Sequence, residues 1–264
     1  MAHIPKKRFG QHFLRDATVL RQAIELGEVA ENDQVLEIGA GDGTLTRALL
    51  EAGARVTAIE LDRDLLGDLR ELAEGEPRLN LIEGDATKID HFDLPTPTKV
   101  ISNLPYQIAT AIISDICQRP DWFPLMVIMV QREVGRRLAA KPGGKDYGTL
   151  TLWIGHRYAV EIKRIVPPGA FRPPPKVDSA LVLMKARERP LVNVPDEEGY
   201  FKLIRSAFSM RRKTLLNNLR SFIPAGGGQP DWKKVFEKAG IDGGCRAETL
   251  GAEEFARIFK ALGT

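Results

Sequence analysis

The chain has few cysteines and no long apolar segment. Its two cysteines, Cys117 and Cys245, stand far apart in the sequence, which argues against a disulfide framework or a cysteine metal site. No apolar run approaches the roughly 20 residues of a membrane-spanning helix, and the basic start around Lys6 is not followed by the apolar core of a signal peptide. We therefore expect a cytoplasmic protein with neither a metal nor a membrane anchor.

Acidic residues are missing from one stretch. The whole chain has 38 Lys and Arg against 35 Asp and Glu, a net charge of +3, but residues 200–220 contain six basic residues and no acidic one. A local excess of positive charge suits a partner that carries phosphates. The alternative is an ordinary solvated helix face.

Glycines, in contrast, are concentrated in residues 35–44. The apolar run 35–38 has the length of a buried strand, and Gly39, Gly41 and Gly43 follow it before a helical pattern begins. Glycines allow positive φ and let a ligand approach the backbone, and the N–H groups of the following helix start can hold a small anionic or zwitterionic group. The alternative is a tight turn with a purely structural role.

The spacing of these glycines separates two classes of ligand. The dinucleotide fingerprint G-x-G-x-x-G would place its third glycine at position 44, which is Thr44. Glu37 stands before the turn, and a second apolar run ends in Glu60, at the spacing where an acid meets ribose hydroxyls in doubly wound folds. This combination resembles the S-adenosylmethionine site of class I methyltransferases.

Strand and helix patterns alternate along most of the chain. We expect strands and helices as follows: strands at 34–38, 55–59, 79–83, 99–102, 125–130, 158–166 and 179–185, with helices at 45–52 and 63–73. Such alternation builds crossover units and a parallel sheet, so the expected class is α/β with a Rossmann-like sheet. From Tyr200 onward the apolar residues follow a helical period. The sequence therefore predicts a sheet domain over residues 1–188 and a small all-helical domain over residues 189–264.

The tetrapeptide Asn103-Leu104-Pro105-Tyr106 follows a predicted strand and is the most specific chemical signal. The lone pair of the adenine N6 amine is delocalised into the ring, so the amine is a poor nucleophile until its N–H bonds are held. The Asn103 side-chain oxygen and the Leu104 carbonyl, whose direction Pro105 fixes, are acceptors suited to that task. The Tyr106 ring can stack on a base. The alternative is a strand-ending turn.

Two further segments carry candidate residues. Asp85 follows the strand 79–83, where its carboxylate could accept a hydrogen bond from the amino group of a cofactor adenine; an Asx-type turn is an equal alternative. The proline-rich linker 167–175 is stiff and carries Phe171 and Arg172 from its middle. Phe171 is therefore a candidate for stacking on a base, the alternative being a spacer with a packed phenylalanine.

Basic and aromatic residues are interleaved near the N-terminus. Lys7 and Arg8 precede Phe9, Phe13 and Leu14. A disordered basic tail is one interpretation, but three large apolar side chains are costly to leave in water. An ordered arm lying across the ligand site fits the sequence better.

Taken together, these motifs resemble a known family. The segments KRFGQHFL at 7–14, EIGAGDG at 37–43, NLPY at 103–106, FRPPPKVDS at 171–179 and FSMRRKTL at 208–215 are similar, in this order, to those of the bacterial 16S rRNA adenine-N6 dimethyltransferases. The resemblance implies a Rossmann-like, S-adenosylmethionine-dependent methyltransferase domain and a helical RNA-binding domain. It further implies that a monomer transfers two methyl groups to each of two adjacent adenines in a hairpin near the 3′ end of 16S rRNA, on a 30S subunit precursor, with a role in small-subunit biogenesis.

The resemblance also implies roles for individual residues. The implied cofactor contacts are His12, Leu14, Gly39, Gly41, Glu60, Asp85 and Asn103, with Glu60 on the ribose and Asp85 on the adenine. The implied catalytic residues are Asn103, Leu104, Pro105 and Tyr106 around the target amine and Phe171 stacked on the base. The implied RNA contacts are Lys7, Arg8, Arg172, Arg211, Arg212 and Lys213.

One residue departs from the family pattern. The family usually has asparagine where this chain has His12. Histidine changes charge near neutral pH and an amide does not. We therefore expect either a cofactor affinity that depends on pH or a contact made by the backbone alone.

Three other functions remain open from the sequence. A 23S rRNA adenine-N6 methyltransferase would share the fold, although the run 209–214 and the leucine of NLPY favour the 16S interpretation. A non-catalytic RNA-binding assembly factor would have no need of the intact glycines and Asn103. A nicotinamide-dependent oxidoreductase would require a different glycine spacing.

Overall fold

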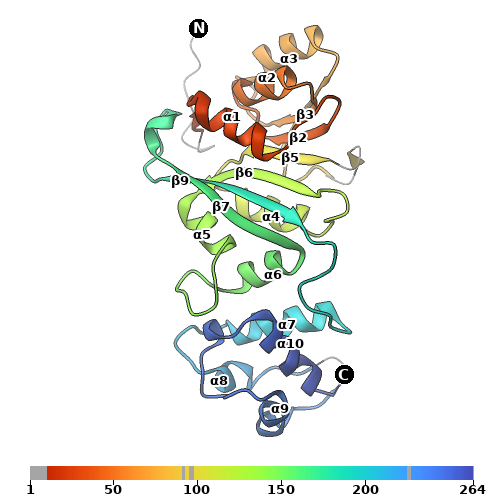
Figure 1. Ribbon diagram of the computed structural model, residues 1–264, viewed down its shortest axis with the longest axis vertical. Coiled ribbons are helices and arrows are strands. Elements are labelled where there is room, and N and C mark those ends of the chain that lie inside the picture. Colours follow the sequence, from red (N-terminus) through yellow and green to blue (C-terminus); the bar gives the residue numbers. More distant parts are fainter. Residues whose placement is uncertain (1–10, 91–92, 95–97, 225–226, 264) are drawn as a thin grey trace. The chain divides into compact units, whose positions relative to one another are not determined.

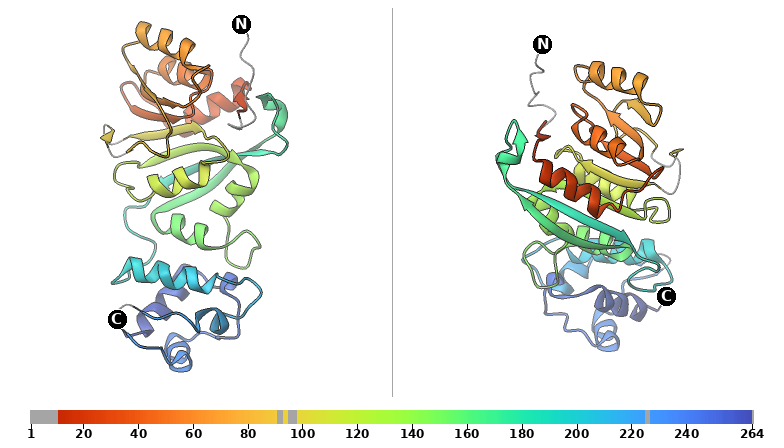
Figure 2. Two further views of the ribbon diagram at one scale, coloured as in Figure 1. Left: turned by 180° about the vertical axis from the view of Figure 1, so that it is seen from behind. Right: turned by 45° about the horizontal axis from the view of Figure 1, so that its top comes forward.

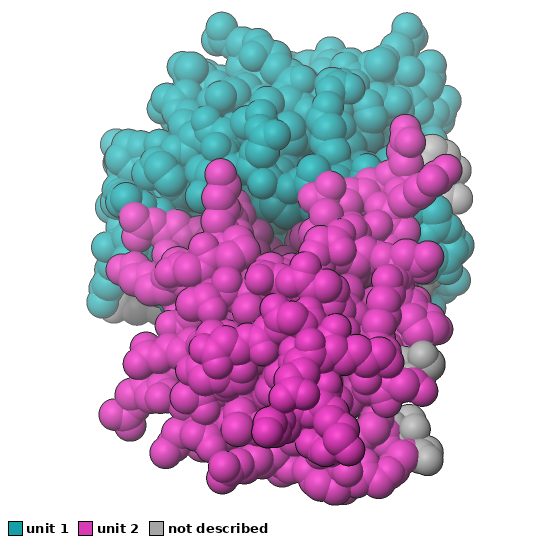
Figure 3. All heavy atoms as spheres, turned by 60° about the horizontal axis from the view of Figure 1, so that its bottom comes forward, with its two compact units in different colours: residues 1–135, 158–186 teal, residues 136–157, 187–264 magenta. Residues whose placement is uncertain are grey.

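The computed structural model describes residues 11–90, 93–94, 98–224 and 227–263 (Figure 1). The chain divides into two compact units, coloured separately in Figure 3. Unit 1 comprises residues 1–135 and 158–186, and unit 2 comprises residues 136–157 and 187–264. Lys7 and Arg8, which the sequence predicts to contact RNA, lie outside the described residues.

Unit 1 is built on a seven-stranded sheet with the strand order β4-β3-β2-β5-β6-β9-β7. Its strands are β2 (Gln34–Ile38), β3 (Arg55–Glu60), β4 (Leu79–Glu83), β5 (Lys99–Asn103), β6 (Leu125–Gln131), β7 (Tyr158–Val166) and β9 (Ser179–Ala186). The first five are parallel to one another, whereas β9 is antiparallel to both β6 and β7. The predicted α/β class is confirmed, and the last two strands form the antiparallel edge seen in green and teal in Figure 2.

Both faces of the central strands are covered, which explains their continuous apolar sequences. On β6, Val127 and Met129 belong to a core cluster to which α1 (Ala17–Leu26), α2 (Thr44–Glu51) and α3 (Leu66–Gly75) also contribute. The alternate residues Met126, Ile128 and Val130 are also buried. Because side chains alternate across a strand, they lie on the opposite face of the sheet.

The described part of the N-terminal arm is ordered, as predicted. Its strand β1 (Phe13–Leu14) pairs antiparallel with β8 (Phe171–Arg172), which follows the short helix η3 (Pro168–Ala170). The carboxylate of Asp16 then accepts hydrogen bonds from the first turn of α1 and caps that helix. The arm is therefore held between a strand partner and a capped helix.

Two helices follow the inner strands of the sheet. Helix α4 (Ala109–Ile116) comes directly after the segment that follows β5, and α5 (Arg132–Leu138) begins in unit 1 at the end of β6 and ends in unit 2. The buried residues of α4 include Ile112, Ile113 and Ile116. An apolar stripe at this spacing fixes a helix on a core.

Unit 2 is helical. Its elements are α6 (Thr149–Arg157), α7 (Glu197–Ala207), α8 (Leu215–Leu219), α9 (Trp232–Ala239), the short helix η4 (Ala247–Thr249) and α10 (Ala252–Ala261). Residues 136–157 group with these helices and not with the sheet domain predicted over residues 1–188, because Tyr147 and Leu152 are buried in the same core cluster as Tyr200. No helix among the described residues is long and apolar enough to cross a membrane.

Candidate active site

A cavity of about 340 Å³ opens within unit 1, beside the carboxyl ends of β2, β3, β4 and β5. In open α/β sheets this is where ligands bind. Five segments line it. They are the arm at residues 11–14, the glycine turn (residues 39–43) with its flanking residues, the end of β3 with the residues after it, residues 84–87 after β4, and residues 103–108. All seven residues predicted to contact the cofactor are among those lining the cavity, namely His12, Leu14, Gly39, Gly41, Glu60, Asp85 and Asn103.

The glycine turn leaves no room for side chains at two positions. Gly39 and Gly41 have φ values of +78° and +61°, a region that residues with a Cβ rarely adopt. A Cβ on Gly39 would lie 2.8 Å from Pro105, and one on Gly41 would lie 2.9 Å from the Phe13 ring. Gly43 has another task, since it is the N-cap of α2 and is absent from the cavity wall. The turn thus keeps bare backbone facing the cavity.

Glu60 organises the end of β3. Its Oε1 accepts hydrogen bonds from the backbone N–H groups of Leu61 and Asp62 at 2.9 and 2.8 Å, and its Oε2 accepts one from Gly41 at 2.7 Å. Burial raises the pKa of Glu60, while these backbone donors act in the opposite direction. A carboxylate offers about four acceptor positions, so one position on Oε2 remains for a ligand hydroxyl.

Glu37 stands on β2 just before the glycine turn, lines the cavity and is 1% exposed. Its Oε2 accepts a hydrogen bond from Thr46 Oγ1 at 2.6 Å, which joins β2 to α2. Burial raises the pKa of Glu37 to about 8. The protonated acid is therefore favoured at neutral pH, and this group adds little negative charge to the cavity wall.

Asp85 follows β4 in a tight turn. Its Oδ1 accepts hydrogen bonds from the backbone N–H and the hydroxyl of Thr87, at 3.0 and 2.7 Å. These bonds lower the pKa of Asp85 and keep it ionised. Asp85 forms an Asx-type turn, which was one interpretation of the sequence, and it also lines the cavity. The turn is therefore compatible with the other interpretation, a contact with the cofactor adenine.

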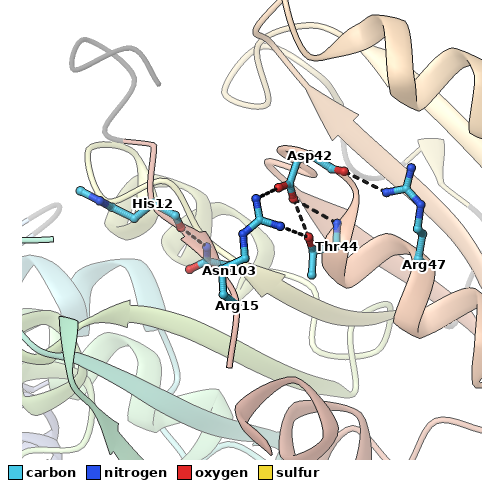
Figure 4. A network of polar contacts seen from close by, with 6 residues as sticks. All are labelled: His12, Arg15, Asp42, Thr44, Arg47 and Asn103. Atoms are coloured by element: carbon cyan, nitrogen blue, oxygen red, sulfur yellow. Dashed lines mark hydrogen bonds and ion pairs between the residues drawn. The ribbon is translucent and has the colours of Figure 1, made fainter. Parts of the chain in front are cut away.

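The side-chain amide of Asn103, at the end of β5, has a fixed orientation. Its Nδ2 donates a hydrogen bond to the backbone carbonyl of His12 at 2.8 Å (Figure 4). A carbonyl can only accept, so this bond assigns nitrogen and oxygen of the amide unambiguously and leaves Oδ1 available as an acceptor. The His12 ring instead donates a hydrogen bond to the Pro173 carbonyl through Nδ1, so the hydrogen bond that holds Asn103 comes from the His12 backbone.

Tyr106 completes the motif. Its ring lines the cavity beside the His12 ring, with a centroid separation of 5.6 Å. Its hydroxyl lies 2.6 Å from the hydroxyl of Ser179, and burial raises the pKa of Tyr106. The aromatic face is thus presented by a side chain that is held at its far end.

Phe171 does not lie where the sequence predicted. The ring is fully buried, in the core cluster that contains Leu14, Val19 and Val166, and it is absent from the cavity wall. The reason is that β8 pairs with β1, which sets Phe171 opposite Leu14 in the core. The expectation that Phe171 stacks on a target base is therefore wrong for this structure, whereas its neighbour Arg172 is exposed.

The predicted RNA contacts of unit 2 lie on the segment between α7 and α8. Arg211, Arg212 and Lys213 are all exposed. Arg211 donates a hydrogen bond to the Lys145 carbonyl and lies 4.0 Å from Glu248. Among the described residues Arg212 and Lys213 have no acidic partner, so two of the three charges are available to a phosphate.

Several residues of the cavity wall were not singled out from the sequence. They include Gln11, Asp42, Thr44, Leu61, Leu65, Thr87, Gln107 and Ile108. Leu61 could have been found because it directly follows Glu60 at a strand end, and Asp42 because it stands inside the glycine turn. The others carry no local signal.

The fold and the cavity together define a class I S-adenosylmethionine-dependent methyltransferase. The residues fit this cofactor: bare glycine backbone faces the cavity, Glu60 keeps one acceptor position for a hydroxyl, and the ionised Asp85 stands at the next strand end. The sequence matches the ribosomal RNA adenine dimethylase family over residues 2–263, and the chain belongs to that family.

Individual relatives agree with this assignment. The chain is 44% identical over 255 residues to the "Ribosomal RNA small subunit methyltransferase A" of Clostridium acetobutylicum, with 96% of this chain and 91% of the relative covered. Its fold is similar to that of a dimethyladenosine transferase from Plasmodium falciparum, with a TM-score of 0.80 and 26% identity over 94% of this chain and 96% of the other. It is also similar to the 23S rRNA methyltransferase ErmE, with a TM-score of 0.74 and 27% identity over 96% and 100% of the two chains.

Proposed function

We propose that this enzyme transfers two methyl groups to the N6 amine of each of two adjacent adenines in a hairpin near the 3′ end of 16S rRNA. The relative with a small-subunit name is 44% identical to this chain, whereas the structure that acts on 23S rRNA is 27% identical. The observation that carries the proposal in the structure is the fixed amide of Asn103, whose oxygen is left free beside the cavity.

The chemistry at the target amine depends on acceptors that are already in place. S-adenosylmethionine, when bound, supplies an electrophilic methyl group on its sulfonium. Asn103 Oδ1 accepts one N–H of the adenine amine and the Leu104 carbonyl accepts the other, which localises the nitrogen lone pair for attack. Pro105 packs against Gly39 of the glycine turn, so the motif and the cofactor seat share one contact and are held at a fixed separation.

Tyr106 provides the stacking surface for the target base. An adenine flipped out of an RNA hairpin loses its stacking partners and is stabilised by an aromatic ring. Tyr106 lines the cavity and its hydroxyl is anchored on Ser179. No general base is required, because the ammonium product is acidic enough to release its proton to water.

We assign the rRNA backbone contacts to Arg172 in unit 1 and to Arg211, Arg212 and Lys213 in unit 2. All four side chains are exposed. Basic side chains that neutralise phosphates release counterions, so their contribution falls as salt rises. The substrate on this proposal is a precursor of the 30S subunit in the cytoplasm, and the enzyme acts as a monomer in small-subunit biogenesis.

The substrate is tested with labelled S-adenosylmethionine and ribosomal subunits that lack the dimethyladenosines. We expect the label to enter the small subunit, at up to four methyl groups per subunit, and to map to adjacent adenines in the 3′ hairpin of 16S rRNA. Large subunits serve as the matched control. Label in 23S rRNA would identify the alternative target, and transfer to neither subunit would contradict the proposal.

The phosphate contacts are tested by salt titration of RNA binding. The double variant R212A/K213A is expected to reduce the slope of log K against log salt by about 1.4 to 1.8, at roughly 0.7 to 0.9 per phosphate contact. The control is K234A/K238A, which removes two exposed lysines of α9 in the same unit. Equal slopes for both variants would remove Arg212 and Lys213 from the RNA interface.

A further inference from the structure

The described part of the N-terminal arm makes contacts with two parts of the active site. Its backbone carbonyl at His12 holds the Asn103 amide, the Phe13 ring lies against the backbone of Gly41, and the Arg15 side chain reaches the glycine turn (Figure 4). The first of these contacts belongs to the target amine and the other two to the cofactor seat. One short segment therefore joins both halves of the site.

Arg15 makes the polar connection to the glycine turn. Its guanidinium forms an ion pair with Asp42 Oδ2 and donates a second hydrogen bond to Thr44 Oγ1 at 3.1 Å. A planar guanidinium that contacts two acceptors has a defined direction, which a lysine would not provide. The two contacts therefore fix both the position and the orientation of the end of the arm.

The acceptor for Arg15 is itself rigid. Asp42 Oδ1 accepts hydrogen bonds from the Thr44 backbone N–H at 3.2 Å and from the Thr44 hydroxyl at 2.7 Å. Arg47, on α2, donates to the Asp42 carbonyl at 2.9 Å, so that two arginines approach Asp42 from opposite sides (Figure 4). Asp42 and Thr44 both line the cavity, whereas Arg15 and Arg47 do not.

We propose that Arg15 is a positioning residue that clamps the arm onto the glycine turn, so that it retains the cofactor and keeps the Asn103 amide aligned. Residues 11–14 of the arm and the glycine turn line the same cavity, so a clamped arm would slow the escape of a cofactor bound there. Because the same arm holds Asn103 through His12, a loosened arm also frees the acceptor of the target amine. The effect on Asn103 rests on the proposed function, whereas the retention of the cofactor does not.

Arg15 is not required to keep the arm folded. Its side chain is 47% exposed, and the arm is also fixed by the β1–β8 pairing and by the burial of Leu14. An exposed ion pair contributes little to global stability. A purely structural role would therefore change the unfolding temperature and leave cofactor release unaltered, which is the opposite of what the clamp requires.

The experiment compares R15A, D42N, the double variant R15A/D42N and the control R47A in the full-length enzyme. D42N keeps an oxygen to accept the bonds from Thr44 but loses the charge that faces Arg15. R47A removes the other arginine from Asp42 without touching the arm. The readouts are the dissociation rate of S-adenosylmethionine without RNA and the amide hydrogen exchange of residues 11–16 with and without cofactor.

We expect R15A to raise the dissociation rate roughly fivefold and to accelerate exchange in the cofactor-bound arm. R47A should remain within about twofold of the wild type, and R15A should have little further effect in the D42N background. Added salt should bring the wild type toward R15A, since the pair is solvent-accessible. R15K keeps the charge but not the planar guanidinium that contacts two acceptors, so its dissociation rate should lie between those of the wild type and R15A.

The proposal is overturned if R15A releases the cofactor no faster than R47A, or if R15A has the same effect with and without D42N. These measurements need no rRNA, so they are independent of which rRNA is the substrate. The link to Asn103 is then tested by turnover. A fall in kcat of R15A at saturating cofactor supports it, and an unchanged kcat with faster cofactor release removes the coupling to the target amine.

Discussion

The hydroxyl groups of Tyr106 and Ser179 lie 2.6 Å apart, although 73 residues separate them in the sequence. Ser179 is fully buried as the first residue of β9, and it is the last residue of the segment FRPPPKVDS at 171–179. The sequence predicted that this segment supplies an aromatic ring, that of Phe171, for stacking on a base. In the structure it supplies a hydroxyl that anchors the ring of Tyr106.

The Ser179 anchor predicts a specific defect in turnover. S179A leaves the Tyr106 hydroxyl without its partner, at a cost of about 1 to 3 kcal/mol, so the ring is held less firmly. We expect kcat to fall roughly tenfold while the affinity for S-adenosylmethionine stays within about twofold. Y106F should behave similarly, and S179A/Y106F should be no worse than either single variant, because both remove the same bond.

The matched control for this pair is Y158F. Tyr158 also donates a hydrogen bond from a buried ring in unit 1, to the Phe123 carbonyl at 2.9 Å, but it does not line the cavity. Y158F should lower the unfolding temperature and leave kcat unchanged. Additive losses in S179A/Y106F would show that the two hydroxyls act separately.

Replacing Asn103 with alanine should affect catalysis far more than cofactor binding. Loss of an acceptor placed for the transition state costs about 100-fold to 1000-fold in comparable sites, and we expect a fall in kcat of that order for N103A. Cofactor affinity should change only severalfold, through the lost bond to the arm. Single-turnover methylation and equilibrium binding separate the two quantities, with N80A, an exposed amide on β4, as the control. A kcat close to that of the wild type would remove this account of the site.

Glu60 should govern cofactor affinity. E60Q keeps the shape of the side chain, but its amide NH2 is a donor. It would face backbone N–H groups that donate hydrogen bonds to the carboxylate of Glu60. Hydrogen bonds to a charged group are worth about 1.5 to 3 kcal/mol each, so the loss of one bond should weaken S-adenosylmethionine binding roughly tenfold to 100-fold. Calorimetric titration would measure this loss.

Glu83 provides the control for Glu60. It is paired with Glu60 across β3 and β4 but forms a surface ion pair with Arg70. E83Q should therefore bind the cofactor like the wild type. If E60Q and E83Q bind equally well, the carboxylate at the end of β3 is not part of the cofactor site.

Glu37 predicts a pH dependence of stability. Burial raises its pKa from 4.5 to about 8, so between these values the folded protein retains a proton that the unfolded chain releases. The stability contributed by this group is fully present below about pH 4.5 and falls as pH rises toward 8, by about 1.4 kcal/mol per pH unit inside the window. E37Q cannot ionise and should lack this slope.

The unfolding free energy of E37Q minus that of the wild type should therefore increase from pH 6 to pH 8, because only the wild type loses stability as pH rises. Urea denaturation measures both values. E51Q, which replaces an exposed glutamate on α2, serves as the control and should follow the wild type across this range. A difference between E37Q and the wild type that is constant with pH would contradict the assigned ionisation.

The sequence allowed much of unit 1 to be predicted. The central strands were recognisable because each is a short apolar run that is buried on both faces, and the glycine turn because Gly39 and Gly41 adopt positive φ. Glu60 and Asp85 could be found because acids at the ends of parallel strands meet at one edge of a sheet. Each of these signals depends on residues that are neighbours in the chain.

The remaining site contacts join distant segments. Asn103 is held by the His12 carbonyl 91 residues away, Arg15 by Asp42 27 residues away and Tyr106 by Ser179. No local pattern encodes these contacts, because they depend on which strands pair and in which register. The same holds for Phe171, whose aromatic character suggested stacking until its pairing with Leu14 set it in the core.

The sequence by itself thus determined the class of fold, the glycine turn and the tetrapeptide 103–106 that lines the cavity, since short-range periodicity and backbone conformation are properties of consecutive residues. Only the tertiary structure decided that the arm contacts the glycine turn, that residues 136–157 join the helical unit, and that Ser179 anchors the Tyr106 hydroxyl while Phe171 is buried in the core. These features arise from long-range packing, in which a side chain is buried or exposed according to the segment that lies opposite it.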